Sequence, residues 1–422
     1  MLLLLAALQM VGADTVRQIS LEEALRLGTQ LDPGYVTALG QVRNATWQRR
    51  AAFTTFILPS VVFQTAATRY SSDAFNIGTL QPASQIVTAQ LSANYDLFRG
   101  GAKFFELARA RADFESAEAS ALQARYRTAL LIEADYYDVL AQQELTRVSE
   151  ERVRRAAEQL TVARARVVSG AAVQTDSLQL LLELTRARVD LLRQRSSLTV
   201  ARLQLGRRVG LTGPAAAAPV DAAPPALPLS VDAAVAEAID AGPSYQAARA
   251  KARAASASAR SGWSLYLPQI TLNGLVTAFD DRFFPNATTR SSLGISFTLP
   301  LWNNGQREIA LSQARVARDI AAAVADDAAR AARRDVVEAY EAYTTAQASS
   351  ELARQQLAVA GENLRVQQER YRAGATTILD LVTAQVSITE AEAGVVQARY
   401  AARLALAGLE AILGRRLFAG ER

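Results

Sequence analysis

Carboxylates are the main candidates for acid–base chemistry in this 422-residue chain. The sequence contains no cysteine and no histidine, which excludes thiol catalysis, disulfides, histidine proton transfer and zinc sites built on these residues. Two carboxylate pairs, Glu22–Glu23 and Asp280–Asp281, lie at an expected helix cap and loop end and have no convergent partners. No nucleophile motif or glycine-rich phosphate loop is present. We therefore expect no enzyme, no cofactor and no metal.

The charge pattern also argues against nucleic-acid binding. The formal net charge is +5, and nearly all the basic residues are arginines that alternate with acidic residues along helical stretches. A nucleic-acid site would show a one-sided basic stripe with aromatic platforms. Solvated helix faces explain the pattern better.

The N-terminus resembles a secretory signal. Residues 1–13 form a short apolar run that ends in the small-residue site Val11-Gly-Ala13. We expect a signal-peptide remnant whose true translation start lies upstream, because the basic segment that usually precedes such a run is missing; the alternative is an apolar helix end. No other stretch has the ~20 uncharged apolar residues that a transmembrane helix requires.

The chain is one unit written twice. Asp32-Pro-Gly-Tyr35 aligns with Gly242-Pro-Ser-Tyr245, and Leu97-Phe-Arg-Gly-Gly101 aligns with Leu301-Trp-Asn-Asn-Gly305. From Leu97 to Gly210 the offset between the copies never changes. We therefore predict a first repeat over 20–210 and a second over 230–415. The proline- and alanine-rich stretch 211–229 between them is predicted to be an extended linker.

Each repeat is predicted to contain two β-strands. Leu293, Ile295, Phe297 and Leu299 alternate with small or polar residues, and period-2 alternation indicates a strand. The predicted strands span about 60–72, 85–98, 268–279 and 291–302, joined by long polar hairpins near 71–84 and 280–291. A soluble sandwich could show the same alternation. Two features favour a membrane barrel: strands of about ten residues can cross a bilayer, and Phe98 and Trp302 suit an interfacial girdle.

Four strands cannot close a barrel alone, since the smallest known barrels need ~8. Open sheet edges are not tolerated in lipid. Strands in a membrane would therefore have to be shared between chains, and three chains would supply twelve strands.

Long helices follow the strands. Proline is absent from about 102 to 167 and from 306 to 422, so we predict long helices over 102–168, 176–209, 306–372 and 377–413. Leu352, Val359 and Val366 form one heptad line, and Leu357, Leu364 and Tyr371 form another about 140° around the helix. Two seams suit a closed wall of helices, although a buried bundle helix could also show them.

The helical runs break at matching places. Gly170 and Gly374 suit the residue after a helix end, and Thr175–Asp176 and Thr377 are plausible caps of the returning helices. We predict helical hairpins whose tips lie at the end opposite the strands.

At these tips the sequence resembles a known family. The segment Tyr371-Arg-Ala-Gly-Ala-Thr-Thr-Ile-Leu-Asp-Leu-Val-Thr-Ala-Gln385, the glycine- and asparagine-bearing turns and the duplication resemble TolC-type outer-membrane efflux proteins. The resemblance covers about 20–415. It implies a mainly α fold with a small antiparallel β part, in which a homotrimer forms a twelve-stranded β-barrel continued by an α-helical barrel across the periplasm. The linker would help form an equatorial collar.

The resemblance also implies roles for tip residues. Asp380 matches the gate constriction, and its second aspartate position is Thr383. Thr175, Asp176 and Tyr371 match an inter-helix latch. A latch arginine is replaced by Thr376, and Arg399 matches another arginine of the gate region. Ordinary capping is the alternative role for each tip residue.

These patterns together predict a passive exit duct in the outer membrane. No nucleotide motif is present, so an inner-membrane pump and a periplasmic adaptor would have to supply energy and open the tip. The alternative is a soluble coiled-coil scaffold, which explains the helices but not the matched strands. The exported substrate and the class of pump do not follow from the sequence.

Overall fold

The computed structural model describes residues 16–220, 226–282, 284 and 288–417, and the chain in it forms two compact units. One unit combines the segments up to 38, 121–244 and from 330 onward; the other combines 39–120 and 245–329. The predicted signal segment 1–13 lies outside the described residues.

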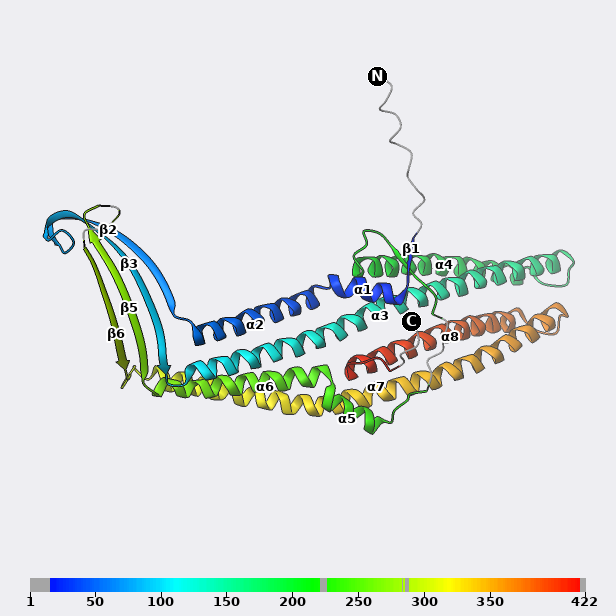
Figure 1. Ribbon diagram of the computed structural model, residues 1–422. Coiled ribbons are helices and arrows are strands. Elements are labelled where there is room, and N and C mark those ends of the chain that lie inside the picture. The colour runs from blue at the N-terminus through cyan, green and yellow to red at the C-terminus, as the bar shows by residue number, and fades with distance from the viewer. Residues whose placement is uncertain (1–15, 221–225, 283, 285–287, 418–422) are drawn as a thin grey trace, which may run out of the picture. The chain divides into compact units, whose positions relative to one another are not determined.

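The second unit contains an antiparallel four-stranded sheet. Its strands are β2 (Ser60–Asn76), β3 (Gln81–Arg99), β5 (Gln269–Asp280) and β6 (Thr288–Thr298), in the order β2-β3-β5-β6 (Figure 1). The central β3–β5 pair joins the hairpin of one repeat to that of the other. β2 and β6 are the edges of the sheet.

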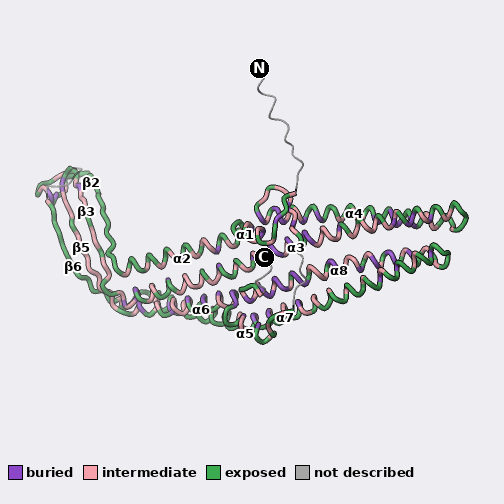
Figure 2. Tube along the Cα trace, turned by 45° about the vertical axis from the view of Figure 1, so that its right-hand side comes forward, coloured by how far each residue is buried: buried purple, intermediate pink, exposed green. Residues whose placement is uncertain are grey.

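The two faces of this sheet differ in chemistry. The register aligns Phe63, Leu91 and Val276 on one face, and Gln64, Gln90 and Thr277 on the other. Figure 2 shows that the strands are exposed or half-buried along most of their length. On the apolar face Phe63 is 68% exposed and Leu293 is 77% exposed. This sheet is therefore not the core of a soluble domain.

The strand ends differ from the prediction. The polar segment 71–84, predicted to be a loop, lies mostly within β2 and β3, and the turn between them is confined to 77–80. The pairing shifts register between Arg69 and Ala74, which lets the hairpin continue past its polar residues. β6 ends at Thr298 rather than at 302, because Pro300 has no N–H to donate. The Arg307 guanidinium instead donates to the carbonyls of Pro300 (2.7 Å) and Leu301 (3.1 Å).

Helices make up most of the remaining chain. They are α1 (Leu21–Leu31), α2 (Pro33–Ile57), α3 (Ala102–Val168), α4 (Gln174–Arg208), α5 (Val231–Ala241), α6 (Pro243–Ser261), the 3₁₀ turn η1 (Gly262–Tyr266), α7 (Gln306–Arg372) and α8 (Ile378–Leu413). α3 and α7 each contain 67 residues, roughly 100 Å at 1.5 Å per residue. Each repeat opens with a capped helix, since Ser20 accepts from the Glu23 amide and Ser230 from that of Ala233. None of the described helices is long and apolar enough to span a bilayer.

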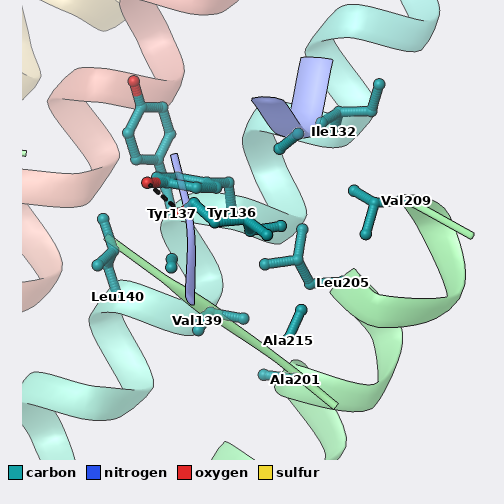
Figure 3. Packing of buried hydrophobic residues seen from close by; sticks show 12 residues of the cluster. Ile132, Tyr136, Tyr137, Val139, Leu140, Ala201, Leu205, Val209 and Ala215 are labelled. Atoms are coloured by element: carbon teal, nitrogen blue, oxygen red, sulfur yellow. Dashed lines mark hydrogen bonds between the residues drawn. The ribbon is translucent and has the colours of Figure 1, made fainter. Parts of the chain in front are cut away.

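The core of the first unit gathers around Tyr136 of α3 (Figure 3). Tyr136 is fully buried, and its hydroxyl donates to the carbonyl of Ala218 at 2.8 Å. Leu205 of α4 and Val209, the residue that follows α4, pack beside it.

The stretch between the repeats, predicted to be an extended linker, also contributes to this core. Its strand β4 (Ala215–Ala217) pairs in parallel with β1 (Arg17–Ile19). Ala215 and Ala217 are buried, and their small side chains let the backbone approach closely. A Cβ added at Gly206 of α4 would lie 2.1 Å from the carbonyl oxygen of Gly213.

Candidate functional site

Both helical hairpins turn on a glycine in the left-handed region. Gly170 has φ 75° and Gly374 has φ 73°. The amide of Ala171 donates to the carbonyl of Arg166, and the amide of Ala375 donates to that of Arg370, both at 2.8 Å. This closure satisfies the last carbonyls of α3 and α7 and reverses the chain within a few residues.

The returning helices begin differently in the two repeats. Thr377 caps α8, because its hydroxyl accepts from the Asp380 amide at 3.2 Å. α4 begins after Val173, which has no side-chain cap. The predicted cap at Thr175–Asp176 is therefore wrong: both residues lie inside the first turn of α4, where the Asp176 carboxylate interacts favourably with the helix dipole.

Asp380 is held tightly in its own turn. Its Oδ2 accepts from the Thr376 hydroxyl (2.9 Å), the Thr377 hydroxyl (2.7 Å) and the Thr377 amide (3.1 Å). The hydrogen bonds from Thr377 and then Thr376 lower the pKa of Asp380. Asp380 and Thr383, one turn later, are exposed, while Leu381 and Ala384 between and beside them are buried. α8 thus presents an ionised carboxylate on its uncovered side at the tip.

Arg166 joins the two tips, a contact that sequence reasoning missed. Its guanidinium donates to the carbonyl of Tyr371, and the guanidinium carbon lies 4.6 Å from the centroid of the Tyr371 ring. Arg166 also donates to the carbonyl of Ala171 at 3.1 Å. The duplication indicated part of this arrangement. Arg370 occupies the position in the second repeat that matches Arg166, and it donates to the carbonyl of Ala375 at 3.3 Å. The contact between Arg166 and Tyr371 could not be predicted from the duplication.

The Asp176 carboxylate lies close enough to the Tyr371 hydroxyl to affect its pKa. Burial raises the pKa of the Tyr371 hydroxyl, the Asp176 carboxylate raises it further, and Arg166 opposes both. Tyr371 is 2% exposed. The structure therefore brings Arg166, Asp176 and Tyr371 to one place.

Arg399 does not join this group. It lies 19 residues after Asp380 in α8, roughly 28 Å along the helix. Its Nη1 lies 2.9 Å from each carboxylate oxygen of Glu144 in α3, and the Tyr400 hydroxyl donates to Glu144 at 2.7 Å. Arg155 of α3 and Glu392 of α8 form a second pair, with contacts of 2.9 and 2.7 Å. These ion pairs fasten α3 of one repeat to α8 of the other, away from the tip.

Comparison with known families agrees with this architecture. The family described as outer membrane efflux protein matches residues 32–211 and 234–415, one match for each repeat. Because the matches cover most of the sequence, the chain belongs to this family. It is thus an outer-membrane channel protein of efflux systems, as the resemblance implied, and the soluble scaffold is set aside.

Solved structures share the fold at low sequence identity. The outer membrane protein VceC of Vibrio cholerae is 18% identical with a TM-score of 0.79, covering 94% of this chain and 97% of VceC. The open-state MtrE channel of Neisseria gonorrhoeae is 19% identical with a TM-score of 0.77, covering 95% and 90%. The CmeC channel of Campylobacter jejuni is 16% identical with a TM-score of 0.76, covering 93% and 85%. No protein of curated function matches the sequence.

Proposed function

We propose that three copies of this chain close one twelve-stranded barrel that serves as the exit duct of a tripartite export system. The open sheet carries this proposal. Its order β2-β3-β5-β6 is antiparallel throughout, so β6 runs opposite to β2. β6 of one copy can therefore pair with β2 of the next in the same antiparallel pattern, which removes every free edge. Its two faces suit lipid outside and an aqueous lumen inside.

The helices support assembly with further copies. α4 leaves a line of apolar residues exposed on one side of the helix, spaced 4, 7, 3, 8 and 3 positions apart: Leu178, Leu182, Val189, Leu192, Val200 and Leu203. On α7, Leu364 and Tyr371 are buried within the chain, whereas Leu352, Val359 and Val366 of the other heptad line are exposed. The buried heptad line thus packs within the chain, and the exposed heptad line is available to contact a neighbouring copy.

The gate of this duct lies at the tips. In the proposal, the exposed Asp380 and Thr383 line the constriction, and Thr175, Asp176, Tyr371 and Arg166 hold the hairpins closed. The ion pair of Arg399 with Glu144 supports the helices behind the gate. The duct is passive, so a periplasmic adaptor and an inner-membrane pump supply the energy and open the periplasmic end.

Cross-linking of the sheet edges tests the assembly directly. The chain has no cysteine, so Thr65→Cys on β2 can be combined with single cysteines at Ser291, Leu293 and Ile295 on the matching face of β6. Mild oxidation of the detergent-extracted protein should give covalent dimers and trimers, and nothing larger, for at least one pair. Cysteines at Thr65 and at Ala93 on the central strand β3 are the control and should give no cross-link between copies. Longer polymers or dimers alone would contradict a three-membered ring.

A further inference from the structure

One row of the sheet's polar face carries an arginine. Gln64 of β2 is paired with Gln90 of β3, Gln90 with Thr277 of β5, and Thr277 with Arg290 of β6. Paired residues project to the same face. The neighbouring rows on that face are uncharged, including Ser92, Leu275 and Ser292. Arg290 is exposed.

The two other charges that the register of the described strands places on this face, Asp96 and Arg99, compensate each other. Asp96, paired with Thr271, lies toward the helical end of β3. It accepts from the Thr271 hydroxyl at 3.2 Å, and Arg99 lies 3.7 Å away. Arg290 differs, because no carboxylate of the described residues is within ion-pair distance of it. Asp280 is buried and belongs to the opposite face, where it pairs with Val87. Asp73 lies in the unpaired stretch of β2 between Arg69 and Ala74.

We propose that Arg290 makes the outer half of the duct selective for anionic solutes. The inference rests on the proposed trimer, in which three-fold symmetry places three Arg290 side chains around one lumen. A ring of arginines around a lumen with low-dielectric walls concentrates anions and repels cations. Guanidinium groups also bind carboxylates and phosphates through paired hydrogen bonds. The substrate class that fits is therefore organic anions, with carboxylate or phosphate groups, that pass the ring on their way out.

The rate at which a single cysteine reacts with charged reagents reports the electrostatic potential at this row. This rate does not depend on how strongly the gate at the helical tips restricts current. Thr277→Cys places the only thiol of the chain beside Arg290, since paired Cα atoms lie about 5 Å apart. The probes are a negatively and a positively charged methanethiosulfonate of similar size, applied to the purified protein in lipid nanodiscs. Each rate is divided by the rate of the same reagent with a free thiol.

The normalised anionic-to-cationic rate ratio should exceed one and should fall about three- to tenfold when Arg290→Gln is added, as expected for one charge at about 5 Å in screened water. Arg290→Lys should keep most of the preference. Arg69→Gln is the matched control, because Arg69 is an exposed β2 arginine on the opposite face, and it should leave the ratio unchanged. A ratio that Arg290→Gln does not lower would overturn the proposed selectivity.

A further variant distinguishes a duct that lacks anion selectivity from the absence of a duct. Val276→Cys lies next to Thr277 in sequence but on the apolar face. If the barrel is as proposed, Val276→Cys in a bilayer reacts far more slowly than Thr277→Cys. Equal reactivity, or an unreactive Thr277→Cys, would mean that the polar face is not a lumen, and both proposals would fall.

Discussion

The guanidinium of Arg166 stacks on the ring of Tyr371, 4.6 Å from its centroid, and donates to the carbonyl of the same residue. These residues are 205 positions apart and lie in the last turns of α3 and α7, the long helices of the two repeats. The contact makes the two hairpin tips of one chain a single mechanical unit. A gate built from such tips would open only if this contact breaks or moves with them.

Replacing Arg166 should therefore loosen the gate. Arg166→Ala removes a cation–π contact of about 1 kcal/mol and a charged hydrogen bond of similar size. We expect the open probability in planar bilayers to rise by roughly tenfold or more. Arg166→Lys should lie between the variant and the wild type, because lysine keeps the charge but not the planar stacking. Arg164→Ala, an exposed arginine two residues earlier, is the control. Unchanged open probability in Arg166→Ala would show that the tie does not restrain the gate.

Asp380 should not act as a pH sensor in the physiological range. Its hydrogen bonds hold its pKa in the folded protein below the usual value. The stabilisation is therefore fully present above the unfolded pKa of about 4 and is lost only as the pH falls through the lower folded pKa. Any difference in conductance between Asp380→Asn and the wild type should stay constant from pH 8 to pH 5. A midpoint inside that interval would contradict this account of the carboxylate.

Glu133 should respond to pH in the opposite sense. It is 2% exposed, and burial raises its pKa although Arg416, which donates to it, works against the shift. A raised folded pKa means that stability is fully present below the unfolded value, about 4.3, and is lost as the pH rises through the folded value. Glu133→Gln removes this loss, so its melting temperature relative to the wild type should be higher at pH 8 than at about pH 4, below the unfolded pKa. The exposed Glu158→Gln on the same helix should show no such trend. A relative melting temperature that is the same at both pH values would refute the role of burial.

Two helical glycines should respond oppositely to alanine. At Gly206 the added Cβ would meet the carbonyl oxygen of Gly213 at 2.1 Å, and a backbone group cannot move away cheaply. Gly206→Ala should cost about 1–3 kcal/mol and lower the melting temperature. Gly408 of α8 has nothing within 4 Å of its added Cβ, so Gly408→Ala should stabilise by up to ~1 kcal/mol. If Gly206→Ala were neutral in calorimetry, the close packing of α4 against the inter-repeat stretch would be wrong.

The fold class could be predicted from the sequence because its signals are local and occur twice. Proline-free runs bounded by glycine define α3 and α7, and period-2 alternation defines the sheet. The family match confirms that class. The pairing of β4 with β1 was missed, since three alanines carry no strand signal and their partner lies about 200 residues away.

The candidate site could be predicted only in part, for a related reason. The turns at Gly170 and Gly374 could be predicted because these positions have a positive φ that few other residues adopt. The Arg166–Tyr371 contact and the distance of Arg399 from the tip depend on how separate helices pack, and no local pattern records that. The role of each tip residue in gating remains a prediction.

Single-channel conductance in planar bilayers tests the central claim, a trimeric duct closed at its helical tips, most directly. Purified wild-type protein should insert and show a low conductance. Asp380→Ala, which removes both the carboxylate of the proposed constriction and the acidic half of the α8 capping box, should raise it. An absence of conductance in both proteins would contradict the duct.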